Sequence, residues 1–306
     1  MPIDPWAGVL EAPIPVGVNP NILAVSDNGQ YLYAGLDGEA AIQRVDLASR
    51  TPDLHFGLGI HPFSGSLMHA EDIEVVPGSP ESIVVSRRNF SGSPRHEGVA
   101  VFDGAVQRPI TTPRHTGSNR IEFGNDPSTL YGYNNEATDF GFRTMRVDSN
   151  GVETVFEPPF WLFVGFELDF VFDGQWAIAT SGQVIDPVAS VSVGEFWPFG
   201  PKAGSVVSDP ANDAVFFLAG NVISIYDRDG FVLRDTIVVP GASSHTFDLW
   251  RWGADGLAFR DAGTDRVWLV NGVMVPAPHA ALVLAPVAVL RRTRRSPVCG
   301  GSATAL

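Results

Sequence analysis

The sequence predicts an all-β protein built as a single β-propeller, and three observations carry this prediction. Short runs rich in Val, Ile, Phe, Tyr and Trp dominate the 306 residues, while long stretches of helical periodicity are missing. Gly occurs 32 times and Pro 24 times, which indicates many turns between short elements. One pattern of strands also recurs along the chain. Together these features favour a ring of four-stranded blades.

Each repeat begins with an apolar strand, a tight polar turn and a second apolar strand. Six copies are present, at residues 23–36, 73–86, 121–134, 168–181, 205–220 and 249–262. A third strand follows each copy and ends at a turn residue, namely Asp46, Asp103, Asp148, Asp186, Asp227 or Asn271. A fourth apolar run follows most of them. This is the period of a propeller blade, which cannot bury both faces alone and therefore packs against its neighbours.

The aspartates that end the third strands are interpreted as architectural. An aspartate side chain accepts hydrogen bonds from backbone amides two residues further on and tolerates unusual backbone angles. The segments DSNG (148–151) and DRDG (227–230) resemble the start of a calcium loop, but neither continues into one. We therefore expect ordinary strand turns at both places.

Six blades are expected, with seven as the alternative. After Asn271 only GVMV precedes the C-terminal tail, so the sixth blade lacks an outer strand. Residues 12–18 (APIPVGV) precede the first repeat and have the length of a strand. We expect them to complete the last blade, because this would close the ring and remove an open edge. A seventh blade would have to fit into residues 56–70, which are too few. The propeller then spans residues 1–274.

Charge and cysteine content exclude some classes of partner and site. The net charge is −14, and an acidic body repels nucleic-acid phosphate and anionic lipid, so no nucleic-acid partner is expected. The single cysteine, Cys299, allows neither an internal disulfide nor a cysteine-rich metal site. The N-terminal MPIDPWAGVL lacks a basic region followed by an apolar run, so it is not expected to act as a signal peptide.

The first repeat resembles a known kind of bacterial propeller. LAVSDNGQYLYAGLDGEAAIQRVDLASR is similar to the repeats of the YVTN and quinoprotein-dehydrogenase-like families. The matching residues are Ser26, Asp27, Gly29, Tyr31, Tyr33, Val45, Asp46, Leu47 and Ala48. The other five repeats match loosely. The resemblance implies the fold but no single function, because such propellers include enzymes, ligand binders and scaffolds. Repeated tryptophan motifs that would hold a quinone cofactor are not evident.

Candidate site residues gather in long loops on one face of the expected ring. The loops from the fourth strand into the next blade, and from the second strand to the third, surround one mouth of the channel. The long ones here are 59–72, 87–98, 111–120 and 133–143. Function tends to be carried by such loops. The candidate ligand-binding residues in them are His69, Glu71, Asp72, Arg88, Arg95, His96, His115, Arg120, Asn134 and Asn135, with Glu136 and Asp139 nearby.

These residues allow several interpretations. A polar pocket over blades 1–3 could bind a small molecule, a sugar or a divalent metal ion, since neutral histidine beside a carboxylate can hold a metal or transfer a proton. No HxH, HExxH, GxSxG or EF-hand pattern supports a particular chemistry. Alternatively the residues are solvated, and Asp72 and Arg120 pair with neighbours at the channel rim. The aromatic segments WPF, LWRW and PPFWLF could form a carbohydrate platform, but packing between blades is expected for them.

Residues 275–306 are expected to form a flexible tail with a possible sorting signal. The uncharged run Ala280–Leu290 would span only ~16 Å as a helix, and a bilayer core needs ~20 residues. The order of its parts resembles the PEP-CTERM class of bacterial sorting signals, on Val275, Pro276, Pro278 and the arginine cluster at 291–295. Ala277 stands where that class has Glu. Membrane contact would be transient, and a chain ending at Gly272 is expected to fold.

The sequence thus predicts an exported propeller, periplasmic or at the cell surface, that binds a small molecule, a sugar or a protein as a non-enzymatic binding or scaffold module. The alternative is an enzyme, a hydrolase, lactonase or lyase, that uses the channel mouth of blades 1–3. A dehydrogenase-like propeller with a partner subunit is a third possibility. A buried, mutually hydrogen-bonded cluster of His69, Asp72, His96 and Arg120 would favour the enzyme.

Overall fold

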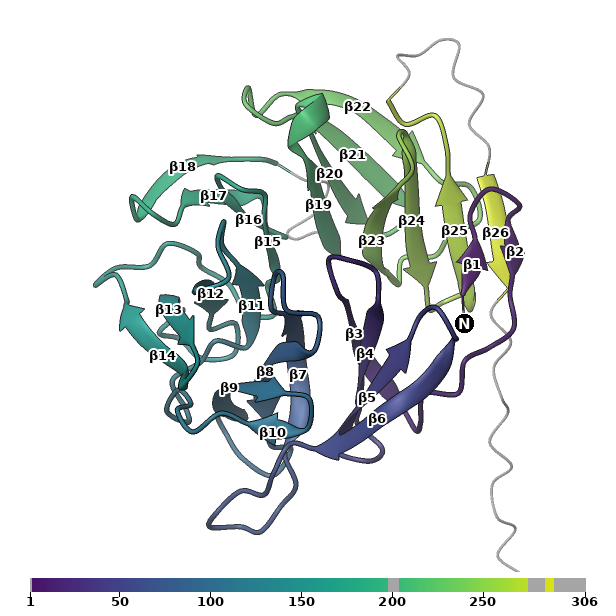
Figure 1. The fold of residues 1–306 in the computed structure, drawn as a ribbon. Helices are drawn as coiled ribbons and strands as arrows, with labels where there is room; N and C mark the ends of the chain where they lie inside the picture. Colours follow the sequence, from purple (N-terminus) through teal and green to yellow (C-terminus); the bar gives the residue numbers. More distant parts are fainter. Residues whose placement is uncertain (1, 198–203, 275–283, 289–306) are drawn as a thin grey trace, which may run out of the picture.

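Six four-stranded antiparallel sheets stand around a common axis, as the sequence predicts (Figure 1). The structure, a computed structural model, describes residues 2–197, 204–274 and 284–288. Blades 1 to 3 consist of β3 (Pro20–Val25), β4 (Tyr31–Leu36), β5 (Ala41–Asp46), β6 (Thr51–Gly57); β7 (His69–Val75), β8 (Ser82–Arg88), β9 (His96–Asp103), β10 (Val106–Gln107); and β11 (Arg120–Phe123), β12 (Thr129–Tyr133), β13 (Phe142–Asp148), β14 (Gly151–Phe156). Blades 4 to 6 consist of β15 (Phe170–Phe172), β16 (Ala177–Ala179), β17 (Gln183–Asp186), β18 (Val191–Glu195); β19 (Ser205–Asp209), β20 (Ala214–Ala219), β21 (Val222–Asp227), β22 (Leu233–Val238); and β23 (Thr246–Trp252), β24 (Gly256–Asp261), β25 (Arg266–Val270), β26 (Leu284–Ala288).

The first strand of each blade is the innermost. β3 contacts β7, and the same relation continues through β11, β15, β19 and β23 around the ring. A short hairpin of β1 (Ile3–Asp4) and β2 (Val9–Leu10) lies outside the blades, and a 3₁₀ turn, η1 (Pro210–Asn212), connects β19 to β20 within blade 5. In the part of the chain that the structure describes, no helix is long and apolar enough to cross a membrane.

The turns after the third strands are built as expected. The Asp148 carboxylate accepts a hydrogen bond from the amide of Asn150 at 2.7 Å, and the Asp186 carboxylate accepts one from Val188 at 2.9 Å. Each donor lies two residues beyond its aspartate, which is the geometry of an Asx turn. The segments 148–151 and 227–230 are the turns into β14 and β22. Their aspartates therefore serve the architecture of the blades.

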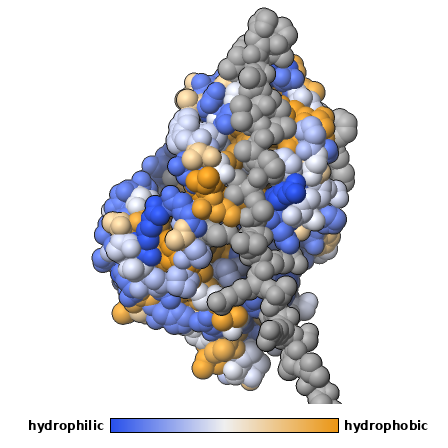
Figure 2. Space-filling model, turned by 90° about the vertical axis from the view of Figure 1, so that its right-hand side faces the viewer, coloured by the Kyte–Doolittle hydropathy of each residue, from blue (hydrophilic) through white to orange (hydrophobic). Residues whose placement is uncertain are grey.

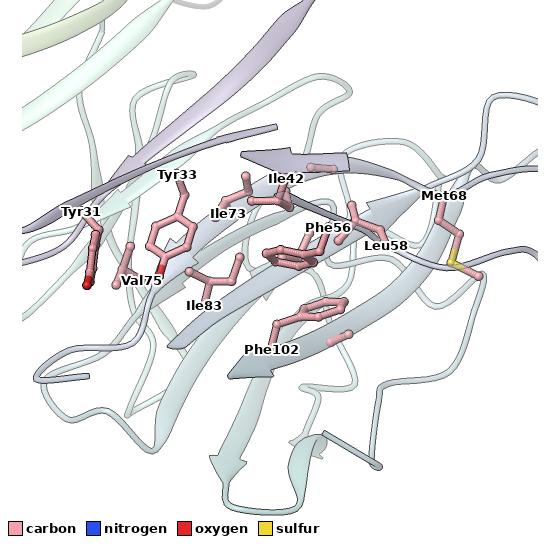
Figure 3. Close-up of a cluster of buried hydrophobic side chains, with 13 residues drawn as sticks. Tyr31, Tyr33, Ile42, Phe56, Leu58, Met68, Ile73, Val75, Ile83 and Phe102 are labelled. Carbon is pink, nitrogen blue, oxygen red and sulfur yellow. The ribbon is translucent and has the colours of Figure 1, made fainter. Parts of the chain in front are cut away.

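The hydrophobic core lies between the blades. Alternation along the strands supplies each blade with two apolar faces, and five buried clusters occupy the junctions of blades 1–2, 2–3, 3–4, 4–5 and 5–6. Figure 3 shows the first, where Tyr33 and Ile42 of blade 1 meet Ile73 and Ile83 of blade 2. Among the described residues, no cluster of this kind joins blade 6 to blade 1.

The predicted closure of the ring is wrong. Residues 12–18 belong to no strand, and β26 is the outer strand of blade 6 instead, with Ala288 opposite Arg266 and Leu284 opposite Val270. β26 lies inside the segment that the sequence suggested as a free tail. Pro286 is tolerated there, because an edge strand uses the hydrogen-bonding groups of only one side. The arginine cluster and the rest of that segment lie outside the described residues.

The N-terminal segment and β26 therefore do not share a sheet. The junction of blades 6 and 1 also differs from the other junctions in the exposure of its apolar side chains. Leu23 and Val25 of β3 and Trp250 of β23 are each about half exposed, although they lie on innermost strands. The N-terminal hairpin contacts blade 6 through Trp6, whose ring meets Trp252 edge to face at 5.0 Å. The side of the molecule with blades 6 and 1 shows separate apolar patches among hydrophilic ones (Figure 2).

Candidate functional site

A polar cavity of about 400 Å³ lies on the long-loop face, where blades 2 and 3 meet. We call it the first cavity. Eight residues line it: Glu71, Arg88, Arg95, Arg120, Asn135, Glu136, Phe166 and Glu167. Three come from strand ends, in β7, β8 and β11, and the others come from the connecting loops. Neighbouring strands of two blades therefore fix three of the seven polar residues, and loops add the other four.

A β-bulge places Glu71 in the wall of this cavity. On β7, Ala70 lies opposite Arg87 and Asp72 lies opposite Ser86, so Glu71 is the extra residue. A bulge leaves one residue out of the ladder and turns its side chain in a new direction. Such a bulge at the mouth of the ring is a local feature that the alternation of apolar residues does not reveal.

Two carboxyl groups, of Glu71 and Glu136, share one amide donor. Nδ2 of Asn119 lies 3.0 Å from Oε2 of Glu71 and 3.4 Å from Oε2 of Glu136. Burial raises the pKa of Glu71, and the Asn119 hydrogen bond and the charge of Arg120 oppose the rise. Glu136 has a different environment, because Arg95 donates to it from Nε at 2.8 Å and from its backbone amide at 3.0 Å.

Oxygens of the chain anchor two arginines of the cavity, Arg88 and Arg120. Nη2 of Arg88 contacts both carboxylate oxygens of Asp37, at 3.0 and 2.9 Å. Arg120 lies 3.7 Å from Asp169 and 3.5 Å from the carbonyl of Glu71. Nε of Arg88, Nε of Arg120 and Oδ1 of Asn119 are buried and have no hydrogen-bond partner within the described chain. These three atoms have almost no accessible surface, so they are not contacts for a ligand in the cavity as it stands.

Five of the ten predicted residues line the first cavity, namely Glu71, Arg88, Arg95, Arg120 and Asn135. His69 lies beside them: its ring is 4.5 Å from Phe90, and its Nδ1 is 3.8 Å from Asp37. Partial burial lowers the pKa of His69, which the Asp37 charge opposes. His69 therefore supports the wall without lining it.

The other four predicted residues have structural roles. Asp72 accepts hydrogen bonds from the backbone amides of Ile73 and Ile121. His96 is fully buried, and burial lowers its pKa to about 3. His115 is exposed, and its amide donates to the His96 carbonyl. Asn134 accepts from the amides of Glu136 and Ala137 and so shapes the loop 134–141.

The cluster that would favour an enzyme is not formed. His69, Asp72, His96 and Arg120 make no hydrogen bonds with one another among the described residues, although the charges of Asp72 and Arg120 attract each other. No group of three or more His, Cys, Asp or Glu side chains in the described ranges is arranged to hold a metal ion.

Phe166 and Glu167 are lining residues that the sequence did not single out. They follow the segment PPFWLF, for which packing between blades was expected. That expectation holds for Leu162 and Phe163, which are buried, but Phe160 and Trp161 are exposed by more than half of their surface. Their position in the chain could have identified them as candidates. Residues 157–169 connect β14 to β15 and so lie on the same face as the other long loops.

Comparison with models of known protein families gives no match, and comparison with curated protein sequences gives none either. The function must therefore be argued from the geometry of the site itself.

Proposed function

We propose that this propeller is a binding module whose first cavity holds a small, hydroxyl-rich ligand such as a sugar. The observation that carries the proposal is the composition of the cavity wall, with three arginines, three glutamates, one asparagine and the exposed face of Phe166. A sugar hydroxyl both donates and accepts, so it pairs with carboxylate oxygens and guanidinium groups alike. The volume lies in the range of small-ligand sites.

Balanced charge supports a hydroxyl-rich ligand over a simple anion or cation. Each arginine of the wall already lies near a carboxylate: Arg88 near Asp37, Arg95 near Glu136, and Arg120 near Asp169. An anion would therefore meet carboxylates together with the arginines. A neutral polar molecule avoids this repulsion and can pair with both the guanidinium and the carboxylate groups of the wall.

A second candidate function, a glycoside-cleaving enzyme, is favoured by the two carboxyls that Asn119 joins. Burial raises the pKa of Glu71, while Glu136 is paired with Arg95. Two carboxyls in unlike environments are the arrangement of a general acid and its partner. Binding remains the first choice because both carboxyls already accept hydrogen bonds from side chains of the chain, Glu71 from Asn119 and Glu136 from Arg95.

Calorimetric titration with neutral hexoses and hexuronic acids tests the proposal. At least one sugar should bind, and Glu136→Gln should weaken its binding about tenfold, which corresponds to ~1.4 kcal/mol. Glu153→Gln is the matched control, because Glu153 lies on β14 outside the cavity. Failure of every sugar to bind would remove the proposal. Release of product from an aryl-glycoside panel, abolished by Glu71→Gln, would instead establish the enzyme.

We also propose that the protein is exported and acts in the periplasm or at the cell surface. The support is the resemblance of the first repeat to YVTN and quinoprotein-dehydrogenase-like propellers, and of residues 275–295 to a PEP-CTERM signal. Because β26 uses residues 284–288, any processing of this segment must be compatible with an intact blade 6. Fractionation of cells that produce the full chain tests the location, and recovery only in the cytoplasm would contradict it.

A further inference from the structure

An aromatic ridge separates the first cavity from a second one. The buried ring of Phe140 meets Phe166 edge to face at 5.0 Å on one side and Trp161 edge to face at 5.8 Å on the other. Phe166 is 51% exposed and Trp161 is 60% exposed. The ridge therefore presents two aromatic surfaces, with Phe140 as their common support.

The ridge is anchored and not a loose surface loop. Leu162 and Phe163, between the two exposed rings in the chain, are buried in the core of blades 3 and 4. The hydroxyl of Tyr133 donates to the carbonyl of Gly165 at 2.8 Å. A rigid aromatic group binds a ligand at little cost in side-chain entropy.

The second cavity has a volume of about 390 Å³ and is polar on one side and aromatic on the other. Its lining residues are Asp139, Gly141, Glu157, Pro158, Pro159, Phe160 and Trp161. Arg143 holds the two carboxylates in place: it donates to Glu157 at 3.0 and 2.9 Å and to Asp139 at 3.3 Å. Both cavities therefore combine carboxylate groups that are paired with arginine and an exposed aromatic ring.

The same two loops build both cavities. Loop 134–141 gives Asn135 and Glu136 to the first cavity and Asp139 and Gly141 to the second. Loop 157–169 gives Phe166 and Glu167 to the first and residues 157–161 to the second. Asn134 fixes the first loop, because it bonds the amide of Glu136 and the carboxylate of Asp139. The cavities are therefore neighbours in a single structural unit.

We infer that the two cavities are adjacent subsites for an oligosaccharide, with one sugar unit in the first cavity and a following unit against Trp161. This inference rests on the proposed function of the first cavity. Sugars have an apolar face that packs on an aromatic ring and hydroxyls at their edges that reach carboxylates and guanidinium groups. A protein partner fits less well, because the centres of protein interfaces are depleted of charged residues such as those paired here.

Titration of matched monosaccharides, disaccharides and trisaccharides tests the inference. A neutral and a uronic-acid series are both used, and the uronic acids should bind more weakly because their carboxylate meets those of the cavity wall. For the sugar that binds, affinity should rise at least tenfold from one unit to three. Trp161→Ala should remove this gain and leave monosaccharide binding unchanged, whereas Phe166→Ala should weaken both. Phe63→Ala is the control, because Phe63 is an exposed aromatic residue that lines neither cavity.

The outcomes separate the two proposals. If chain length or Trp161→Ala has no effect while Glu136→Gln still weakens monosaccharide binding, the subsite inference is overturned and the first-cavity proposal stands. If Trp161→Ala weakens the monosaccharide as much as the trisaccharide, the cavities are not separate subsites. If neither monosaccharides nor longer sugars bind, both proposals fall together.

Discussion

The carboxylate of Asp72 on β7 accepts a hydrogen bond from the backbone amide of Ile121 on β11 at 2.9 Å, and so links the innermost strands of blades 2 and 3. Glu71, which precedes Asp72 in the chain, and Arg120, which precedes Ile121, both line the first cavity. The sequence suggested Asp72 as a ligand-binding residue, but Oδ2 bonds to blade 3 and Oδ1 accepts from the amide of Ile73 in its own strand. The link fixes the distance between the polar groups of the cavity.

Asp72 should make the stability of the protein depend on pH. Burial raises its pKa to about 7, with the Arg120 charge opposing the shift and Asp169 adding to it. The native state then binds a proton more tightly than the unfolded chain, whose carboxyl has its ordinary pKa near 3.8. The contribution of Asp72 is therefore fully present below pH 4 and is lost as pH rises toward 7, by at most ~1.4 kcal/mol per pH unit.

Urea unfolding at several pH values measures this effect in the wild type and in Asp72→Asn. The variant cannot titrate, so its free energy of unfolding should fall less steeply between pH 4 and 7. Asp235→Asn, at an exposed position of β22, should keep the wild-type slope. Equal slopes in the wild type and Asp72→Asn would contradict the raised pKa.

Arg228 and Asp173 should be the most sensitive ion pair between blades 4 and 5. Nε and Nη2 of Arg228 donate to the two oxygens of Asp173 at 2.7 and 3.2 Å, and the guanidinium lies 4.1 Å from the ring centre of Trp176. Burial alone would raise the pKa of Asp173, but hydrogen bonds from Arg228 and from the amides of Trp176 and Gln175 hold it below its ordinary value.

Arg228→Met should lower the free energy of unfolding by ~3–5 kcal/mol, because it leaves a buried carboxylate unpaired. Arg228→Lys should cost less but not restore the wild type, since an ammonium group cannot make both parallel hydrogen bonds. Arg146→Met, at a largely exposed ion pair, is the control and should change stability by less than ~1 kcal/mol. Similar losses at both positions would show that burial of the pair does not matter.

Glu97 presents the opposite case, a buried carboxylate that is not hydrogen-bonded within the described chain. Its side chain is 1% exposed and both oxygens lack a donor there. Nε2 of His61 is 3.7 Å from Oε1 of Glu97 and 3.1 Å from Nη1 of Arg114. A buried carboxylate without hydrogen bonds is costly, although the charge of Arg87 attracts it.

Glu97→Gln should therefore raise the melting temperature, with a gain in the free energy of unfolding of ~1–3 kcal/mol. Glu136→Gln is the comparison, since Glu136 is paired with Arg95 and should gain nothing. Scanning calorimetry of both variants decides the point. A loss of stability in Glu97→Gln would mean that the carboxylate has a partner in solution, such as a bound cation.

The sequence was most informative where a physical requirement repeats. Each blade needs apolar residues on both faces and a tight turn after its third strand, so six imperfect copies predicted the blades and the roles of Asp148 and Asp186. The long loops likewise predicted the face that carries the first cavity. These features depend on local pattern and on the topology of a propeller.

Features that depend on single contacts could not be predicted from the sequence. Glu71 enters the cavity through a bulge, and Asp72, its neighbour, turns to another blade. His96 and Asn134 lie in the predicted loops or at their edges, yet both are buried in structural roles. Within PPFWLF, neighbouring aromatic residues are divided between core and surface. Residue type and spacing along the chain do not differ between the residues that line the cavity and those that are buried. Only the packing of the folded chain distinguishes the two groups.

The outer strand of blade 6 gives the last prediction. β26 pairs with β25 from Arg266↔Ala288 to Val270↔Leu284, so a chain ending after Met274 loses this ladder and exposes the edge of β25. At a net ~1 kcal/mol per backbone hydrogen bond, the loss should be ~3 kcal/mol and should lower the melting temperature. A chain ending after Ala288 keeps the ladder and should melt like the full chain. Equal melting of both shortened chains would show that blade 6 is stable with three strands and that β26 contributes nothing to closing the ring.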